Sequence, residues 1–231
     1  MNGSVSDIIQ KIALFAPVFI FSLTFHEYGH AWSARRLGDD TAARMGRLTL
    51  NPMAHIDLFG TIIFPLVGLL FGFPLIGWAN PVPINPLRFR RKYSMNKGMA
   101  ITASAGPLAN LLLALASSLI LAALVVFIFS TGGKPGWIEN YLVQVLRMGI
   151  ELNVVLMVFN LIPVPPLDGS RILSWFLPEK YRYGYERLQQ YGMLILYALL
   201  FTGAIEIFFI PAEWIMGLFD SLVQALVGMA L

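Results

Sequence analysis

Several apolar runs in this chain are long enough to cross a lipid bilayer, and they constrain its fold more than any other feature. The first runs from residue 8 to residue 25, and others occupy 100–129, 141–162 and 188–210. A helix needs ~20 predominantly apolar residues to cross a hydrocarbon core about 30 Å thick. Charged residues make up 13% of the chain, whereas a typical soluble domain carries ~25%. The sequence therefore predicts an all-α polytopic membrane protein.

We expect about five to six transmembrane or re-entrant helices in a single domain that covers residues 1–231. The apolar segment 58–78 is interrupted by four Gly and two Pro residues, which favours a re-entrant or broken hairpin over a straight helix. Residues 212–231 are expected to form a last short span or an interfacial helix. A small β-like segment is expected near 44–57, around the alternating residues Arg47-Leu48-Thr49-Leu50.

The basic residues are distributed unevenly along the chain. Four follow the first apolar run, five precede the span at 100–129, and four follow Pro166; together they are 13 of the 16 Lys and Arg residues. All of them fall on one side of the membrane if 58–78 enters and leaves by the same face, and the positive-inside rule makes that side cytoplasmic. The net charge of +3 fits this distribution better than a nucleic-acid interface, so no nucleic-acid partner is expected.

His26, Glu27 and His30 follow the first apolar run in the H-E-x-x-H pattern. In a helix predicted over residues 6–37, the two histidines lie one turn apart on the same face. Their ring nitrogens could bind one Zn²⁺, while Glu27 could reach a water on that ion. The pattern also occurs by chance in soluble helices, but ionisable groups inside an apolar span are costly unless they serve a function.

A catalytic zinc site needs a third protein ligand and an open position for water. The chain has no cysteine, so the ligands must be His, Asp or Glu. Asp168 is the best candidate, because it follows a Pro-rich stretch that ends a span and precedes Gly169, which allows a close turn. Its predicted depth also matches that of the histidines. The alternative is an aspartate that caps a helix or shapes a turn.

Three further polar residues have open roles. His55 could orient substrate, stabilise an oxyanion or support a metal ligand, and a loop histidine hydrogen-bonded to backbone is an equally good interpretation. Asn110 and Asn160 lie in apolar spans, where buried amides commonly hydrogen-bond between helices. They could instead bind substrate backbone or hold a zinc ligand in place.

Four motifs, in this order along the chain, resemble the site-2 protease family of intramembrane zinc metalloproteases, peptidase family M50. They are His26-Glu27-Tyr28-Gly29-His30, Asn51-Pro52 with His55-Ile56-Asp57, Gly106-Pro107-Leu108-Ala109-Asn110, and Asn160-Leu161-Ile162-Pro163-Val164-Pro165-Pro166-Leu167-Asp168-Gly169.

By this resemblance, His26, His30 and Asp168 would bind one Zn²⁺ per chain and Glu27 would be the general base. The substrates would be single-pass transmembrane proteins or peptides, cut within or near their membrane segment. The catalytic core would be three helices, the first one with those at 100–129 and 141–163. The chain is similar to the minimal, bacterial-type branch without a PDZ or CBS domain, which implies a bacterial inner membrane. The distribution of basic residues predicts an active site toward the cytoplasm.

A non-catalytic metal-binding membrane protein or transporter could use the same ligands. Glu27 distinguishes the two functions, since hydrolysis needs a carboxylate beside the ligands and metal storage does not. We therefore expect an intramembrane zinc endopeptidase whose partners are its substrates and the lipid bilayer. The sequence carries no signal for an oligomeric state.

Overall fold

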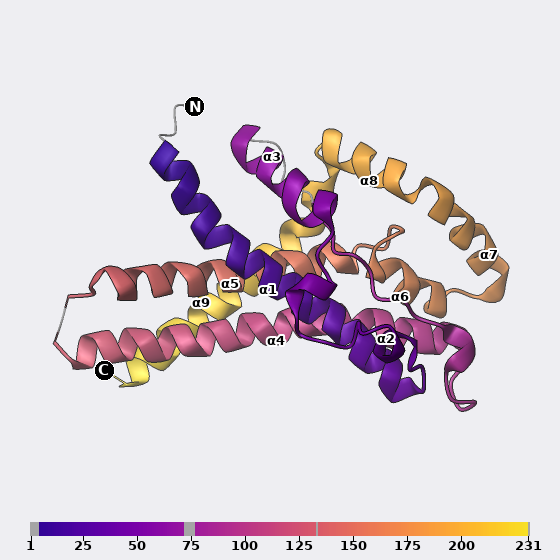
Figure 1. Ribbon diagram of the computed structural model, residues 1–231, viewed down its shortest axis with the longest axis horizontal. Helices are drawn as coiled ribbons and strands as arrows, with labels where there is room; N and C mark the ends of the chain where they lie inside the picture. Colours follow the sequence, from indigo (N-terminus) through magenta and orange to yellow (C-terminus); the bar gives the residue numbers. More distant parts are fainter. Residues whose placement is uncertain (1–4, 72–76, 133, 231) are drawn as a thin grey trace.

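The computed structural model describes residues 5–71, 77–132 and 134–230. Its centre consists of three long helices, α1 (Val5–Leu37), α4 (Met95–Ser130) and α5 (Trp137–Leu161). The helix α1 crosses α4 and α5, which run side by side (Figure 1). These three are long and apolar enough to cross a membrane, and a bent pair of helices near the C-terminus would make a fourth span. The predicted three-helix core is confirmed.

Small residues allow α4 to lie close to its neighbours. The helix begins where the side chain of Ser94 accepts a hydrogen bond from the backbone N–H of Lys97. Helices in lipid associate through close packing rather than the hydrophobic effect, and small side chains permit that approach. The buried positions of α4 are mostly small: Gly98, Ala100, Thr102, Ala103, Gly106, Ala114, Ser118 and Ala122.

The C-terminal helix α9 (Ile210–Ala230) packs against α4 and α5. Ala212 and Phe219 of α9 are buried with Leu121 of α4 and Val154 of α5 in the largest apolar cluster of the described residues. Residues 212–230 of the predicted last segment therefore lie in a helix that belongs to the central bundle.

The predicted span at 188–210 is not one continuous helix. These residues form a 3₁₀ turn, the helix α8 (Gly192–Phe201) and a second 3₁₀ turn, Ala204–Phe209. The chain bends by 93° where Glu179–Phe201 meets Ala204–Ala230. Gly203 adopts a φ of +74° at this bend, a conformation that glycine reaches without steric cost.

The apolar segment 58–78 is broken, as predicted. A π-helical turn (Leu58–Ile63) leads into α3 (Phe64–Phe71). The chain then returns to its starting point, because Trp78 N–H donates to Gly60 O at 3.1 Å and Thr61 Oγ1 donates to Trp78 O at 2.9 Å. The two ends of the segment are thus adjacent, as in a hairpin, while the predicted breaks at Gly72 and Pro74 lie outside the described residues.

The predicted β-like segment near 44–57 is wrong, since no residue of the three described ranges forms a strand. After the short helix α2 (Thr41–Arg44), the chain makes a series of bends and a 3₁₀ turn, Pro52–Ala54. The alternating residues make tertiary contacts and do not pair in a β-ladder. Arg47 donates to Asn80 O and Pro81 O at 2.6 and 3.1 Å.

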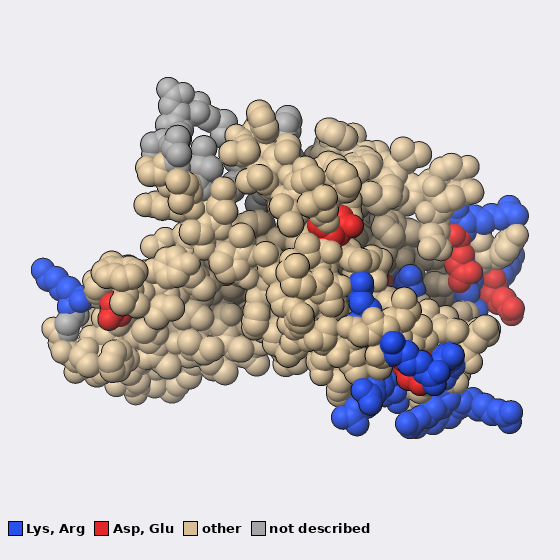
Figure 2. Space-filling model, viewed as in Figure 1, with Lys and Arg blue, Asp and Glu red and all other residues tan. Residues whose placement is uncertain are grey.

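Most Lys and Arg side chains gather at the end of the molecule where α1 ends and α4 begins (Figure 2). Within this group, Arg44 and Arg88 both bind the carboxylate of Asp40, at 2.7 and 2.6 Å. The hydrogen bond from Arg44, supported by that from Arg88, holds the pKa of Asp40 below its usual value. The molecule is therefore strongly polarised in charge along its long axis.

Candidate active site

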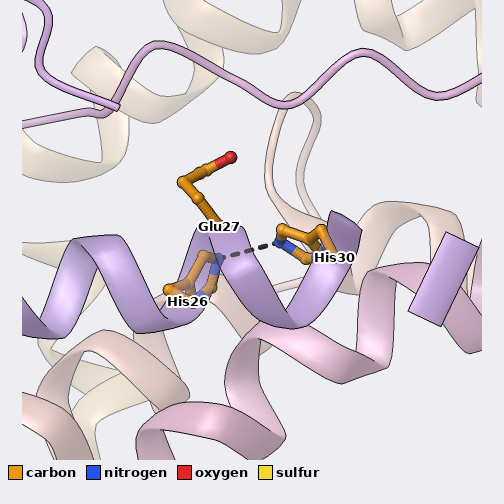
Figure 3. Close-up of side chains that lie close together, drawn as sticks. All are labelled: His26, Glu27 and His30. Carbon is orange, nitrogen blue, oxygen red and sulfur yellow. Dashed lines mark hydrogen bonds between the residues drawn. The ribbon is translucent and has the colours of Figure 1, made fainter. Parts of the chain in front are cut away.

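The two motif histidines and Asp168 meet at one point. His26 Nε2 and His30 Nε2 lie 3.1 Å apart on adjacent turns of α1 (Figure 3). Each of these nitrogens is 3.2 Å from Asp168 Oδ2, at the start of α6 (Asp168–Phe176). A tetrahedral zinc ion with bonds of ~2.0–2.1 Å places its ligand atoms about 3.3 Å apart. The three atoms thus form a triangle of the size that zinc requires.

The hydrogen bonds behind His26 determine which of its nitrogens faces this triangle. Asn153 Nδ2 donates to Gly149 O at 2.8 Å, so Asn153 Oδ1 accepts from Asn110 Nδ2, also at 2.8 Å. Asn110 Oδ1 is then left to accept from His26 Nδ1, which lies 2.6 Å away. The proton of a neutral His26 is therefore on Nδ1, and Nε2 presents a lone pair.

His30 is oriented in the same way. Its Nδ1 lies 2.8 Å from Thr102 O, and a carbonyl oxygen can only accept a hydrogen bond. Two imidazole lone pairs and a carboxylate oxygen therefore converge, and Asp168 Oδ2 is buried without a hydrogen-bond partner. Such a group of acceptors repels itself unless a cation lies among them. The residues present fit a zinc ion, and hydrogen bonds from the outer ring nitrogen are typical of metal-bound histidines.

Glycines let the surrounding helices approach the ligands. A Cβ atom on Gly106 of α4 would lie 2.5 Å from His30 Nε2 and 2.6 Å from His26 Nε2. A Cβ atom on Gly29 of α1 would lie 2.7 Å from Ala105 O. Beside Asp168, a Cβ atom on Gly169 would collide with the backbone carbonyl of Leu161. Packing at these positions fixes the spacing of the three ligand atoms.

Glu27 lies outside the ligand triangle but close to it, with a carboxylate oxygen within 4.8 Å of a ring nitrogen of each histidine. It extends from α1 toward the chain segment that follows Trp78 (Figure 3), where its Oε2 accepts the backbone N–H of Val82 at 3.0 Å. The side chain is buried, yet it lines the same cavity as the two histidines. Glu27 thus places a carboxylate beside the ligands, and the hydrogen bond from Val82 holds that carboxylate in position.

A cavity of about 450 Å³ lies over the ligands, a size typical of sites for small molecules or short peptide segments. Its walls come from α1, the extended residues 77–84, α4, α5, the start of α6 with the turn before it, and α8, and most of its lining is apolar. The polar residues that line it are His26, Glu27, His30, Asn160, Asp168 and Arg171.

The remaining predicted residues occupy different places. Asn110 lies behind His26 rather than in the cavity, and Asn160 lines the cavity while its Nδ2 donates to Leu156 O at 2.9 Å. His55 is buried outside the cavity lining. Its Nε2 donates to Thr49 O at 2.9 Å, and its backbone carbonyl accepts from Asn80 N–H at 2.9 Å.

Sequence reasoning missed the roles of Asn153, Thr102 and Gly106. Asn153 carried a usable signal, since it is an amide inside an apolar span, seven residues before Asn160 and on the same side of the helix. Thr102 contributes only its backbone carbonyl, which no side-chain pattern reveals.

Comparison with known proteins agrees with this site. The sequence model of peptidase family M50 matches residues 14–133 and 125–203. The chain is 38% identical over 189 residues to "Putative zinc metalloprotease YwhC" of Bacillus subtilis. This alignment covers 79% of this chain and 78% of the relative. The chain is 31% identical over 192 residues to "Putative zinc metalloprotease Rip2" of Mycolicibacterium smegmatis, covering 83% and 68% of the two chains.

No solved structure matches the chain. The family match extends over most of the sequence, including most of α1, all of α4 and α5, and Asp168 at the start of α6. With its apolar helices and its group of convergent ligand atoms, the chain belongs to peptidase family M50 and is a membrane zinc metalloprotease.

Proposed function

We propose that this protein is an intramembrane endopeptidase that hydrolyses peptide bonds within or near the transmembrane segments of single-pass membrane proteins or peptides. One zinc ion per chain would be held by His26, His30 and Asp168. The observation that carries the proposal is the position of Glu27, a carboxylate in the cavity beside the ligands but outside their triangle. Its setting among helices of membrane-spanning length implies substrates that share the bilayer.

The zinc ion and the residues of the chain would have different roles in the reaction. When bound, the zinc ion polarises the substrate carbonyl and acidifies a water molecule. Glu27 accepts a proton from the attacking water and delivers it to the leaving amide nitrogen, so that a C–O bond forms as the C–N bond breaks. The Val82 N–H holds Oε2 and so fixes the carboxylate over the cavity. The Asn110 amide and the Thr102 carbonyl keep the two imidazoles in the tautomer that binds metal.

The location of the site follows from charge. The basic residues gather where α1 ends and α4 begins (Figure 2), and the positive-inside rule makes this end cytoplasmic. His30 lies seven residues before the end of α1 at Leu37, which is roughly 10 Å along a helix. We therefore infer a site in the cytoplasmic half of a bacterial inner membrane.

Reconstitution in liposomes with a single-pass model substrate tests the proposal. The wild type should bind about one zinc per chain and cut the substrate in its membrane segment. Glu27→Gln should keep its zinc and lose at least ~100-fold in cleavage rate, the scale of a lost general base. Glu213→Gln is a matched control, because this exposed glutamate lies on α9 outside the cavity. Undiminished cleavage by Glu27→Gln would rule out the mechanism, and a wild type that binds zinc but cuts nothing would favour a metal-binding protein or transporter.

A further inference from the structure

A second cavity of about 260 Å³ adjoins the one over the metal ligands. It is lined by residues of α4, α6, α7 (Glu179–Arg187) and the turns beside them, and its lining is about equally polar and apolar. Three residues, Met99, Pro166 and Arg171, line both cavities. Arg171 thus lies at the boundary between the catalytic cavity and a more polar compartment.

Arg171 has no anionic partner in the part of the chain that the structure describes. Its one recorded side-chain contact is from Nη1 to Met99 Sδ, at 3.9 Å. Some other arginines outside the spans have polar partners: Arg88 binds Asp40, and Arg182 donates to the carbonyls of Ser174 and Leu177.

The carboxylates around Arg171 already have other partners. Glu186, which lines the second cavity, accepts from Ser174 Oγ at 2.8 Å. Asp168 faces the two histidines, and Glu27 is held by Val82. Among the described residues that line the catalytic cavity, Arg171 is the single Lys or Arg. Among the described residues, Arg171 therefore forms no ion pair, although Glu27 and Asp168 line the same cavity.

The position of Arg171 brings that cation close to the reacting atoms. It follows Asp168 by three residues on α6, so the two side chains leave the helix on the same side, with Cβ atoms ~5–6 Å apart. A guanidinium group forms two parallel hydrogen bonds with a carboxylate. Arg171 is exposed, so a carboxylate in either cavity that it lines can reach its guanidinium.

We propose that Arg171 binds a carboxylate of the substrate or product next to the scissile bond, and so determines which segments are cut or how quickly products leave. The inference rests on the proposed function. Two sources share the chemistry: an acidic side chain within a few residues of the cut, and the new C-terminal carboxylate that hydrolysis creates.

The first experiment measures binding without cleavage. A zinc-loaded Glu27→Gln protein in nanodiscs is titrated with a short apolar peptide that ends in a free carboxylate, and with the same peptide as its C-terminal amide. We expect the free acid to bind about 10-fold more tightly, as a charge-assisted hydrogen bond implies. Adding Arg171→Gln should abolish the difference, and Arg171→Lys should restore part of it.

The second experiment compares two model transmembrane substrates that differ only by Glu or Gln beside the cleavage site. For the wild type, Glu should lower KM about 10-fold. Arg171→Gln should remove this preference through KM more than through kcat, at unchanged zinc content. Arg91→Gln is the matched control, because this exposed arginine lines neither cavity.

The two experiments separate the sources of the carboxylate. A dependence on Arg171 in the peptide titration alone identifies the product carboxylate, and a dependence in cleavage alone identifies an acidic substrate residue. A carboxylate preference that survives in Arg171→Gln, or that is missing from the wild type in both experiments, overturns the inference. Failure of the proposed function looks different, since the wild type would then cut neither substrate.

Discussion

The catalytic cavity has two unlike walls. On the ligand wall, formed by α1, α4, α5 and the start of α6, the outer nitrogens of both histidines are hydrogen-bonded and a glycine lies against their inner nitrogens. The opposite wall, formed by residues 77–84 and α8, is mainly apolar and makes one recorded hydrogen bond to an active-site side chain, from Val82 to Glu27. Directional bonds and close packing fix geometry, whereas apolar contacts tolerate displacement. The ligand wall thus suits a metal, and the opposite wall suits substrates of varied sequence.

The largest effect is expected where the ligand wall is tightest. Gly106→Ala would place a methyl group 2.5 Å from His30 Nε2, which forces α4 away or displaces the imidazole. We expect zinc affinity to fall by more than ~100-fold, beyond the usual effect of a lost supporting contact, with activity lost in parallel. Zinc content after dialysis against buffered zinc measures this. Gly217→Ala on α9 is the control, since its added Cβ meets nothing within 4 Å.

A smaller loss is expected when the support of His26 is removed without a clash. Asn110→Leu deletes the acceptor for His26 Nδ1 and should weaken zinc binding by ~10–100-fold. Asn153→Leu acts only through Asn110, so it should cost less. Chelator competition gives the zinc dissociation constants, and Asn160→Leu should leave them unchanged because that amide bonds to Leu156 O. An equal loss in all three variants would mean that the amides act through general packing.

The ligand wall could be predicted from the sequence more fully than the opposite one. A long apolar run needs no tertiary context to become a helix in lipid, and two histidines four residues apart must share its face. Asp168 could be named as a candidate because a Pro-rich stop and a glycine leave few other conformations. The rotation of α5 about its axis brings Asn153 into hydrogen-bonding distance of Asn110. That rotation depends on packing between helices, so the local sequence does not predict it.

The errors in the prediction arose where tertiary contacts overrode a local pattern. Hydropathy is similar on both sides of Gly203, so a 93° bend has no signature in an apolar run. The alternating residues near Arg47 matched a strand, but the Arg47 side chain binds carbonyls of the extended segment, and Leu48 packs on an apolar cluster that includes Ala31. Both errors concern parts of the chain whose conformation is set by distant residues.

The hydrogen bond from Val82 N–H to Glu27 Oε2 joins the two walls, and removing it tests whether the opposite wall affects catalysis separately from zinc binding. Val82→Pro removes the N–H that Glu27 accepts, and the neighbouring Pro81 and Pro83 already favour extended backbone at this position. We expect kcat to fall about 10-fold, the scale of one hydrogen bond to a charged group, at unchanged zinc affinity. Val82→Ala keeps the N–H and should retain most activity. A loss of zinc in Val82→Pro would show that the walls are not independent.

The smallest effect is expected at the base of the opposite wall. The ring of Trp78 packs over Gly60 and lies 5.2 Å from the ring of Phe64, centroid to centroid. Trp78→Ala removes this packing but keeps the two hydrogen bonds that the backbone N–H and C=O of residue 78 make to Gly60 and Thr61. Amide exchange over residues 77–82 should therefore quicken, because less packing opposes local opening. KM should rise only ~2- to 5-fold, on the order of 1 kcal/mol or less. Zinc affinity should match the wild type, since no ligand or ligand support contacts this ring; a weaker affinity would mean that the hairpin also holds α1 in register with α4.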